Sequence, residues 1–281
     1  MLSYRHAFHA GNHADVLKHC IELLLLDYLN QKDKAWWYID SHAGAGLYAL
    51  TEGFAAKNAE FNTGIGKLWH AGNLSEPLKR YVAAVKAINP GGELRHYPGS
   101  PWFALQCARA DDRLKLFELH PSDFDLLAGN FEHVGRRAQL TKTDGFNALK
   151  SVLPPQPRRA LTLIDPPYEV KDDYQRVPAA LEEALRRFAT GTYAVWYPLL
   201  GRADTREMPE KLKKLPAHGW LRAELQVRTP ARDGFGMHGS GMFIVNPPWT
   251  LAATLEKLMP ELVELLGEDA GAIFVLEHHS Q

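Results

Sequence analysis

The sequence contains few cysteines and has almost no net charge. Among its 281 residues only Cys20 and Cys107 are cysteines, and they lie far apart along the chain. Two such residues argue against a disulfide framework or a cysteine-based zinc site, so we expect a protein of the reducing cytoplasm. The formal net charge is -1, so the overall charge does not indicate a nucleic-acid partner. Binding to a nucleic acid would need a local basic face.

Long hydrophobic runs, repeats and low-complexity tracts are also missing. The polar, histidine-rich residues 1–15 argue against a signal peptide. The apolar run at residues 23–26 is flanked by Glu22 and Asp27, whereas a membrane span needs about 20 apolar residues. We therefore expect a soluble protein without a membrane partner, and 46% hydrophobic residues are enough for a sizeable core.

Helical and strand patterns alternate along most of the chain. This alternation is typical of an α/β fold with a mostly parallel sheet and helices on both faces. Helices are predicted at 14–32, 101–110, 121–131, 175–188 and 250–267. Strands are predicted at 35–40, 113–119, 137–142, 161–165, 192–197, 220–228, 242–246 and 272–276.

The gap between the first two core strands is unusually long. A doubly wound sheet expects its second strand sooner, yet residues 57–74 and 75–89 look like two helices. We therefore predict a core of residues 1–52 and 98–281 with a small inserted helical subdomain at 53–97. The insert holds six basic and three acidic residues, a net charge of +3. This excess suits phosphate contact, but a solvated helix face explains it nearly as well.

The first strand runs into a glycine turn, Asp40-Ser41-His42-Ala43-Gly44-Ala45-Gly46. The first strand-to-helix turn of such sheets is the usual ligand cradle, and glycine permits close approach of a ligand. The turn also fits a dinucleotide fingerprint, or it could be a bare turn. NAD is disfavoured because the acidic residue expected about 20 positions later has no strand on which to lie.

The tetrapeptide Asp165-Pro166-Pro167-Tyr168 ends a buried strand and carries the most chemistry. Two prolines remove two amide donors, so nearby backbone carbonyls stay available as rigid acceptors beside the Asp165 carboxylate. Acceptors on both N–H groups of an adenine amine localise its lone pair for attack on a sulfonium methyl. We expect Asp165 to orient the amine and accept its proton, and Tyr168 to stack on an extruded base.

A rival motif occurs in the tail. Asn246-Pro247-Pro248-Trp249 also follows an apolar run and would suit amine methylation equally well. Chain order argues against it, because Asp165 follows the fourth core strand whereas Asn246 follows a tail strand. A proline-stopped strand with a surface tyrosine remains the alternative at Asp165 itself.

With both motifs placed, the chain resembles class I methyltransferases, and more closely the RlmJ family of 23S ribosomal RNA adenine-N6 methyltransferases. The specific match is residues 1–19, which begin Met-Leu-Ser-Tyr-Arg-His-Ala-Phe-His. Weaker matches are residues 40–46, 96–101, 118–120 and 165–169. The resemblance covers essentially the whole chain, insert included.

The resemblance implies a Rossmann-like methyltransferase that acts as a monomer on protein-free 23S rRNA with S-adenosyl-L-methionine. It implies substrate contact at Tyr4. It also implies cofactor contacts at His19, His42, Ser100, Glu118, Asp144, Gly145 and Asp165. The place of Gly44 in the glycine turn, at a strand end, predicts a further cofactor contact there. Independently, Glu118 and Asp144 end the second and third core strands, where carboxylates can accept from ribose hydroxyls and an adenine amine. One departure is that His42-Ala43 replaces the first glycine expected in the superfamily's cofactor loop.

Several features leave alternatives open. His9 and His13 have a zinc-compatible spacing, but no Asp, Glu or Cys cluster completes a site, so we expect no metal. The glycine-rich residues 234–241 form either a mobile loop over the base pocket or a long hairpin. A DNA adenine methyltransferase, an NAD-dependent oxidoreductase and a catalytically inactive nucleic-acid-binding module are the rival functions.

Overall fold

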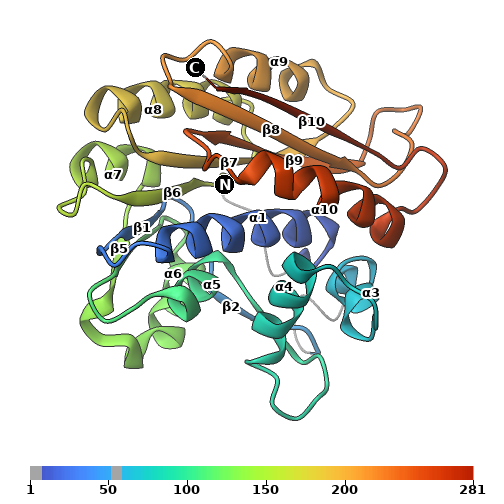
Figure 1. Ribbon diagram of the computed structural model, residues 1–281, viewed down its shortest axis with the longest axis horizontal. Coiled ribbons are helices and arrows are strands. Elements are labelled where there is room, and N and C mark those ends of the chain that lie inside the picture. Colours follow the sequence, from blue (N-terminus) through green and yellow to red (C-terminus); the bar gives the residue numbers. More distant parts are fainter. Residues whose placement is uncertain (1–7, 52–58, 281) are drawn as a thin grey trace.

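The computed structural model describes residues 8–51 and 59–280, and an eight-stranded sheet forms its centre (Figure 1). The strands lie in the order β10-β8-β9-β7-β6-β1-β4-β5, which confirms the predicted α/β class. Their bounds are β1 Trp37–Asp40, β4 Arg113–Glu118, β5 Ala138–Lys142, β6 Ala160–Ile164, β7 Thr192–Leu199, β8 Gly219–Gln226, β9 Gly239–Val245 and β10 Ile273–Ser280.

Five neighbouring strands of the sheet are parallel, and the tail strands bring antiparallel pairing. β7, β6, β1, β4 and β5 pair in parallel. β9 pairs antiparallel with β7 and β8, and β10 pairs antiparallel with β8. The strand order reverses where β1 meets β6. Ligands of open α/β sheets bind outside the carboxyl ends of the strands at such a switch point.

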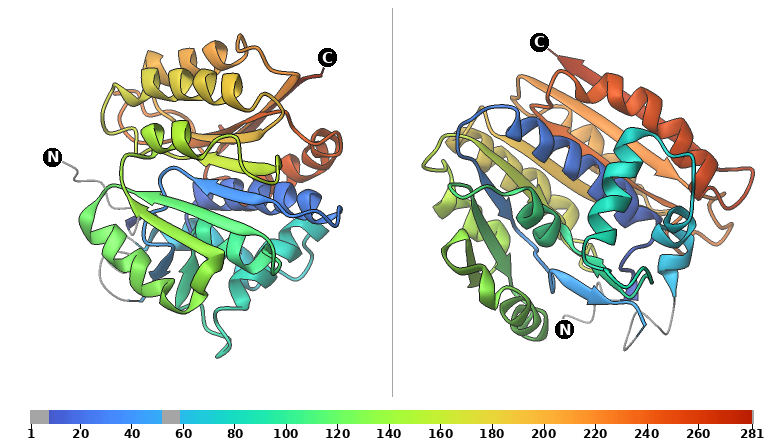
Figure 2. Two further views of the ribbon diagram at one scale, coloured as in Figure 1. Left: turned by 90° about the vertical axis from the view of Figure 1, so that its left-hand side faces the viewer. Right: turned by 60° about the horizontal axis from the view of Figure 1, so that its bottom comes forward.

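Helices cover both faces of the sheet (Figure 2). α1, α5, α6 and α10 contribute to one hydrophobic cluster, and α7, α8 and α9 to a second. The pleat explains the division, since Tyr38 packs into the first cluster and the next residue, Ile39, into the second. The helices are α1 His13–Asn30, α5 Ser100–Cys107, α6 Pro121–Asn130, α7 Gly145–Val152, α8 Asp173–Arg187, α9 Ala203–Leu212 and α10 Leu251–Leu266.

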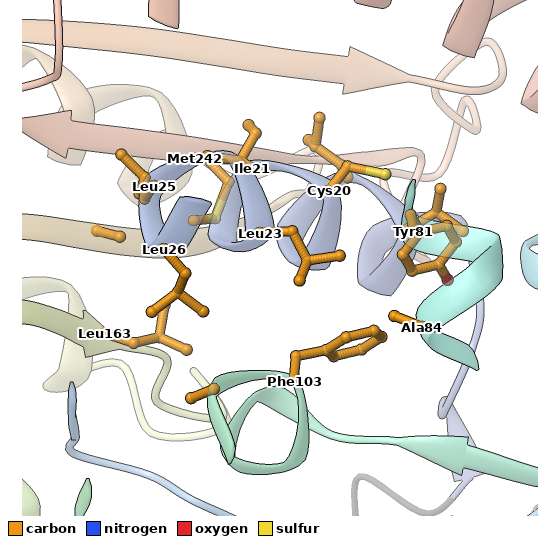
Figure 3. Close-up of a cluster of buried hydrophobic side chains, with 14 of the residues drawn as sticks. Cys20, Ile21, Leu23, Leu25, Leu26, Tyr81, Ala84, Phe103, Leu163 and Met242 are labelled. Atoms are coloured by element: carbon orange, nitrogen blue, oxygen red, sulfur yellow. The ribbon is translucent and has the colours of Figure 1, made fainter. Parts of the chain in front are cut away.

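Helix α1 is buried on several sides, as Figure 3 shows. Met242 of β9, Leu163 of β6, Phe103 of α5 and Tyr81 of α4 (Glu76–Lys86) lie around it. Burying an unpaired polar group is costly, and Lys18 and His19 on this helix have hydrogen-bond partners inside the protein. Glu22 and His13 Nδ1 are exceptions, since among the described residues no hydrogen-bond partner faces these buried atoms.

The inserted segment lies between two short strands, β2 (Leu47–Ala49) and β3 (His96–Pro98), which pair antiparallel. Helix α4 matches the helix predicted at 75–89. The helix predicted at 57–74 is wrong, because a 3₁₀ turn η2 (Glu60–Thr63) and a short helix α3 (Ile65–Trp69) occupy its described part. Gly64 separates them, and a Cβ there would lie 2.1 Å from the carbonyl oxygen of Gly11.

Two smaller differences concern helix ends and short helices. α5 begins at Ser100, one residue earlier than predicted, and Gly99 is its N-cap. The sequence pattern does not predict α7 or α9, which have eight and ten residues. In the part of the chain that the structure describes, no helix is both long and apolar enough for a membrane crossing.

Candidate active site

The glycine turn after β1 is packed so closely that side chains are excluded at two points. Gly44 has a φ of 58°, in the left-handed region, and a Cβ there would lie 2.4 Å from the Tyr48 hydroxyl oxygen. Gly145, the first residue of α7, approaches the same turn. A Cβ at Gly145 would lie 1.8 Å from the carbonyl oxygen of Ser41. The backbone itself therefore forms this wall of the site.

A cavity of about 1090 Å³ opens at the carboxyl ends of β1, β4, β5 and β6. The structure brings all the cofactor-contact residues predicted above together around it. They are His19, His42, Gly44, Ser100, Glu118, Asp144, Gly145 and Asp165. Its lining also includes residues that the sequence analysis missed, notably Lys18, Tyr48 and Arg176.

Glu118 is held by the backbone at the end of β4. Its Oε2 accepts a hydrogen bond from the Gly44 amide at 2.8 Å, and its Oε1 accepts one from the His120 amide at 2.7 Å. Burial raises the pKa of Glu118, although both amide donors oppose this effect. Each oxygen keeps a second lone pair, so the carboxyl group can still accept hydrogen bonds from hydroxyl groups of a ligand.

Asp144 caps α7 and pairs with a residue from a distant helix. One oxygen accepts from the Asn147 amide at 3.1 Å, and the other accepts from the Arg176 guanidinium. Burial would raise the pKa of Asp144, but the Arg176 hydrogen bond outweighs it and holds the pKa below its ordinary value. Arg176 also lies over the Phe146 ring, with its Cζ 4.3 Å from the ring centroid.

His42 is neutral and has a defined tautomer. Burial lowers its pKa to about 4. The Ser41 hydroxyl donates to the Leu163 carbonyl oxygen at 3.1 Å, so it must accept from His42 Nδ1, which lies 2.8 Å away. His42 Nε2 is then an acceptor. A neutral acceptor on the cavity wall can bind an amine or hydroxyl group of a ligand.

Asp165 is tied to a buried lysine on α1. Its Oδ2 lies 2.7 Å from Lys18 Nζ, and Lys18 Nζ is also 2.9 Å from Asp15 Oδ1. Burial alone would lower the pKa of Lys18, but the two carboxylates outweigh it and raise that pKa well above its ordinary value. Asp165 Oδ1 accepts no hydrogen bond from the residues described. One oxygen of Asp165 is therefore held in place, and the other is available to a ligand.

A second cavity of about 700 Å³ meets the first at Asp165. Lys18, Asp165 and Pro167 line both cavities. The remaining lining of the second cavity combines a polar part, formed by His9, Asn12 and Asp15, with a larger apolar and aromatic part. The apolar and aromatic part includes Tyr168, Trp196, Pro198, Leu200 and Met237. Two compartments joined at one carboxylate can hold two reactants with their reacting atoms close together.

The structure limits the role predicted for Tyr168. Its side chain is only 3% exposed, and its hydroxyl donates to the Trp196 carbonyl oxygen at 2.7 Å. Its ring lies 4.8 Å from the Tyr174 ring. Tyr168 therefore forms part of the cavity wall rather than a free surface ring. Tyr4, the predicted substrate contact, lies outside the described residues.

The rival motif at Asn246 lies at the opposite edge of the sheet. β9 is antiparallel to β7, so its carboxyl end at Val245 pairs with Tyr193 near the start of β7. The Asn246 amide donates to the carbonyl oxygens of Ala189 and Gly191, at 2.8 and 2.7 Å. These contacts stabilise a turn, and neither cavity includes Asn246.

The glycine-rich segment is the loop of the β8–β9 hairpin, and it reaches the second cavity. Met237 lines that cavity, and its carbonyl oxygen accepts from Arg228 at 2.7 Å. Phe235 is 82% exposed. Gly201, just after β7, lies against Gly234, since a Cβ at Gly201 would be 2.8 Å from the Gly234 Cα. Within residues 8–51 and 59–280, no cluster of His, Cys, Asp and Glu is suited to a metal ion.

Known proteins match the chain over nearly its whole length. The family model described as "Ribosomal RNA large subunit methyltransferase D, RlmJ" matches residues 33–276. Ribosomal RNA large subunit methyltransferase J of Haemophilus influenzae is 45% identical over 99% of this chain and 98% of its own length. The Escherichia coli protein of the same description is 47% identical over 93% of each. The crystal structure of protein LPL1258 from Legionella pneumophila is 35% identical, with a TM-score of 0.87 over 97% of this chain and 98% of that one.

Proposed function

The chain belongs to the RlmJ family of large-subunit ribosomal RNA methyltransferases, and from that premise we propose that it methylates the N6 amine of one adenine in 23S rRNA. It is an S-adenosylmethionine-dependent enzyme. The observation that carries the proposal is the meeting of two cavities at Asp165, because methyl transfer needs donor and acceptor side by side.

The first cavity has the polar groups that S-adenosylmethionine requires. Glu118 offers acceptors for ribose hydroxyls, and Asp144 and His42 offer acceptors for amine groups. Ser100 begins α5, where the helix dipole favours an anion such as the cofactor carboxylate. The bound cofactor would supply an electrophilic methyl group on its sulfonium.

The second cavity suits a flat base. Its aromatic and apolar walls can enclose an extruded adenine, as enzymes that modify bases require. Asp165 Oδ1 would accept one N–H of the adenine amine, and Lys18 would hold the carboxylate in place through Oδ2. Pro166 and Pro167 lack amide hydrogens, so the adjacent carbonyl oxygens remain available for the second N–H.

Proton transfer follows from the same arrangement. When the amine nitrogen gains the methyl group it must lose one proton, and Asp165 is the acceptor that faces it. Lys18 remains an ammonium group because of its raised pKa, so it orients Asp165 and does not act as the base. Fixed charges of this kind contribute about 10²–10³ in rate per group.

The substrate distinction between RNA and DNA rests on the family and not on the cavity, which contacts a base. We propose protein-free 23S rRNA as the substrate, a monomer as the active form, and the cytoplasm as the location. Purified enzyme should convert one adenine of protein-free 23S rRNA into N6-methyladenosine, detected by mass spectrometry of nucleosides. Preferential methylation of duplex DNA, or of assembled subunits over stripped rRNA, would contradict the respective part of this proposal.

A further inference from the structure

Four buried polar groups form a chain from the inserted segment to the first cavity. Tyr81 Oη on α4 lies 2.9 Å from Tyr97 Oη on β3. Tyr97 Oη lies 2.7 Å from Nδ1 of His19, and His19 Nε2 lies 3.0 Å from Ser100 Oγ. Figure 3 shows the Tyr81 ring and its hydroxyl beside α1. Tyr81, Tyr97 and His19 are fully buried, and Ser100 lines the cavity.

Hydrogen-bond donation along this row of four side chains can run in one of two directions. Each hydroxyl and the neutral imidazole carry one proton to donate. If Ser100 donated to His19, and the order continued to Tyr97 and Tyr81, the Tyr81 hydrogen would have no acceptor. Tyr97 is the one hydrogen-bond partner of the Tyr81 hydroxyl among the described residues. A buried donor without an acceptor is costly.

The opposite direction leaves no buried proton without an acceptor. Tyr81 donates to Tyr97, Tyr97 donates to His19 Nδ1, and His19 Nε2–H donates to Ser100 Oγ. The Ser100 hydrogen then remains for a ligand in the cavity. A doubly protonated His19 would donate at both nitrogens and leave the hydrogen of either Tyr81 or Tyr97 without an acceptor.

The group that Ser100 faces follows from the charges around the cavity. Glu118 and Asp144, on one side, suit neutral donors and would repel an anion. Ser100 lies instead at the start of α5, where the helix dipole favours negative charge. Lys18 is occupied by Asp15 and Asp165. The one anionic group of S-adenosylmethionine, its carboxylate, is the ligand that suits a donating Ser100.

We propose that Tyr81 and Tyr97 are positioning residues that act through His19 to hold Ser100 as a hydrogen-bond donor to the cofactor carboxylate. The inserted segment thereby sets part of the affinity for the amino-acid end of the cofactor, at a distance from the RNA. The inference rests on the cofactor placement proposed above, but it concerns binding and does not depend on which nucleic acid is methylated.

The test compares two ligands that differ in the amino-acid tail. S-adenosylhomocysteine carries the carboxylate, whereas 5′-methylthioadenosine lacks the whole tail. By calorimetry, Tyr97→Phe should weaken the binding of S-adenosylhomocysteine about 3–10-fold, which is the effect of losing one net hydrogen bond. Tyr81→Phe should weaken it less, because it acts one step further away. Binding of 5′-methylthioadenosine should change less than about twofold in either variant.

Tyr193→Phe is the matched control for loss of a buried tyrosine hydroxyl. Its hydroxyl faces the carbonyl oxygens of Ala184 and Phe188 in the second hydrophobic cluster. It should lower the melting temperature and leave the ratio of the two ligand affinities unchanged. If Tyr97→Phe and Tyr81→Phe weakened the binding of both ligands equally, the hydrogen-bonded residues would have only a structural role. That result would overturn the proposal.

Nitrogen-15 NMR of His19 supplies an independent readout. The wild-type ring should carry its proton on Nε2, and Tyr97→Phe should shift the tautomer population towards Nδ1–H. A wild-type ring protonated on Nδ1 would refute the proton direction. If methylation of 23S rRNA fails while the ligand selectivity and the tautomer behave as expected, the proposed substrate is wrong and this inference stands.

Discussion

Lys18 and Asp165 form a buried ion pair at the boundary between the two cavities, with Nζ and Oδ2 2.7 Å apart. The Lys18 side chain is 4% exposed and that of Asp165 is 15% exposed. Asp15 completes the arrangement from the preceding turn of α1, 2.9 Å from the same nitrogen. One ammonium group therefore serves two carboxylates. Both line the second cavity, and of the two only Asp165 also lines the first.

Replacing Lys18 tests whether this pair orients the acid. Lys18→Met should lower the single-turnover methylation rate by about 10²-fold, because Asp165 loses its fixed partner. It should also lower stability, since two carboxylates lose their compensating charge. Asp15→Asn is the control, because it loosens α1 in the same place and keeps the Lys18–Asp165 contact. An equally low rate in Asp15→Asn, measured per folded enzyme, would contradict a specific role for the Lys18–Asp165 contact.

Asp165 itself should separate binding from chemistry. Asp165→Asn keeps the shape but removes the charge, so it should retain cofactor binding and lose most turnover, by about 10²–10³. Asp165→Ala should be inactive. Asn246→Ala should lower the melting temperature, because Asn246 supports a turn at a φ of 53°, and should leave turnover per folded enzyme unchanged. Near-normal methylation by Asp165→Ala would place the chemistry elsewhere.

The sequence was sufficient to predict that the residues around the first cavity lie close together. Gly44 follows a predicted strand, and Glu118 and Asp165 lie at the ends of two others; the carboxyl ends of parallel strands share one edge of a sheet. The order of strands and helices along the chain was therefore enough to predict that the three motifs lie close together. The same reasoning disfavoured Asn246, and the antiparallel pairing of β9 gives the physical reason.

The roles of Lys18 and Tyr97 could not be predicted in this way, because they depend on tertiary packing. Lys18 meets a carboxylate 147 positions away, and no local pattern specifies such a partner. The available signal was weak: Asp15 and Lys18 stand one turn apart on a helix whose other residues are mostly apolar. The orientation of Tyr168 was missed for a related reason, since burial by Tyr174 and Trp196 depends on α8 and β7.

Glu118 should govern cofactor affinity without affecting RNA binding. Glu118→Ala removes acceptors for two ribose hydroxyls and leaves the Gly44 and His120 amides unpaired. We expect S-adenosylhomocysteine to bind about 1–3 kcal/mol more weakly by calorimetry. Binding of 23S rRNA in the absence of cofactor should be unchanged. Undiminished cofactor affinity would remove Glu118 from the site.

Asp40, beneath the glycine turn, should make stability depend on pH. It accepts from the Tyr38 hydroxyl at 3.0 Å and from the His42 amide at 3.1 Å, and burial raises its pKa to about 7. Between about pH 4 and 7 the folded protein therefore binds more protons at Asp40 than the unfolded chain does, so this group makes stability fall as pH rises.

Asp40→Asn cannot ionise and should remove that contribution. Urea unfolding from pH 5 to 8 should show the variant gaining stability relative to wild type as pH rises, by up to about 1–4 kcal/mol at pH 8. Its amide oxygen can still accept from His42, and its amide group can donate to the Tyr38 oxygen. A stability difference that is constant across this pH range would contradict the raised pKa.

The last prediction compares two candidate RNA surfaces. The basic residues of α4 have local partners: Lys79 pairs with Glu76, Arg80 with Asp27, and Lys86 lies over the Trp69 ring. Such contacts are typical of a solvated helix face. The β8–β9 loop instead borders the second cavity through Met237 and presents Phe235 and Arg232 to solvent. An RNA strand whose adenine enters that cavity must pass this loop.

We therefore expect the loop to contribute more to RNA affinity than the insert does. Phe235→Ala should weaken RNA binding by about 1–3 kcal/mol if a flanking base stacks on the ring, with little change in salt dependence. Arg232→Ala should instead flatten the salt dependence, because one fewer counterion is released. The triple variant Lys79→Ala, Arg80→Ala, Lys86→Ala is the comparison. A larger loss of affinity and salt dependence in the triple variant than in both loop variants would place the RNA on the inserted segment.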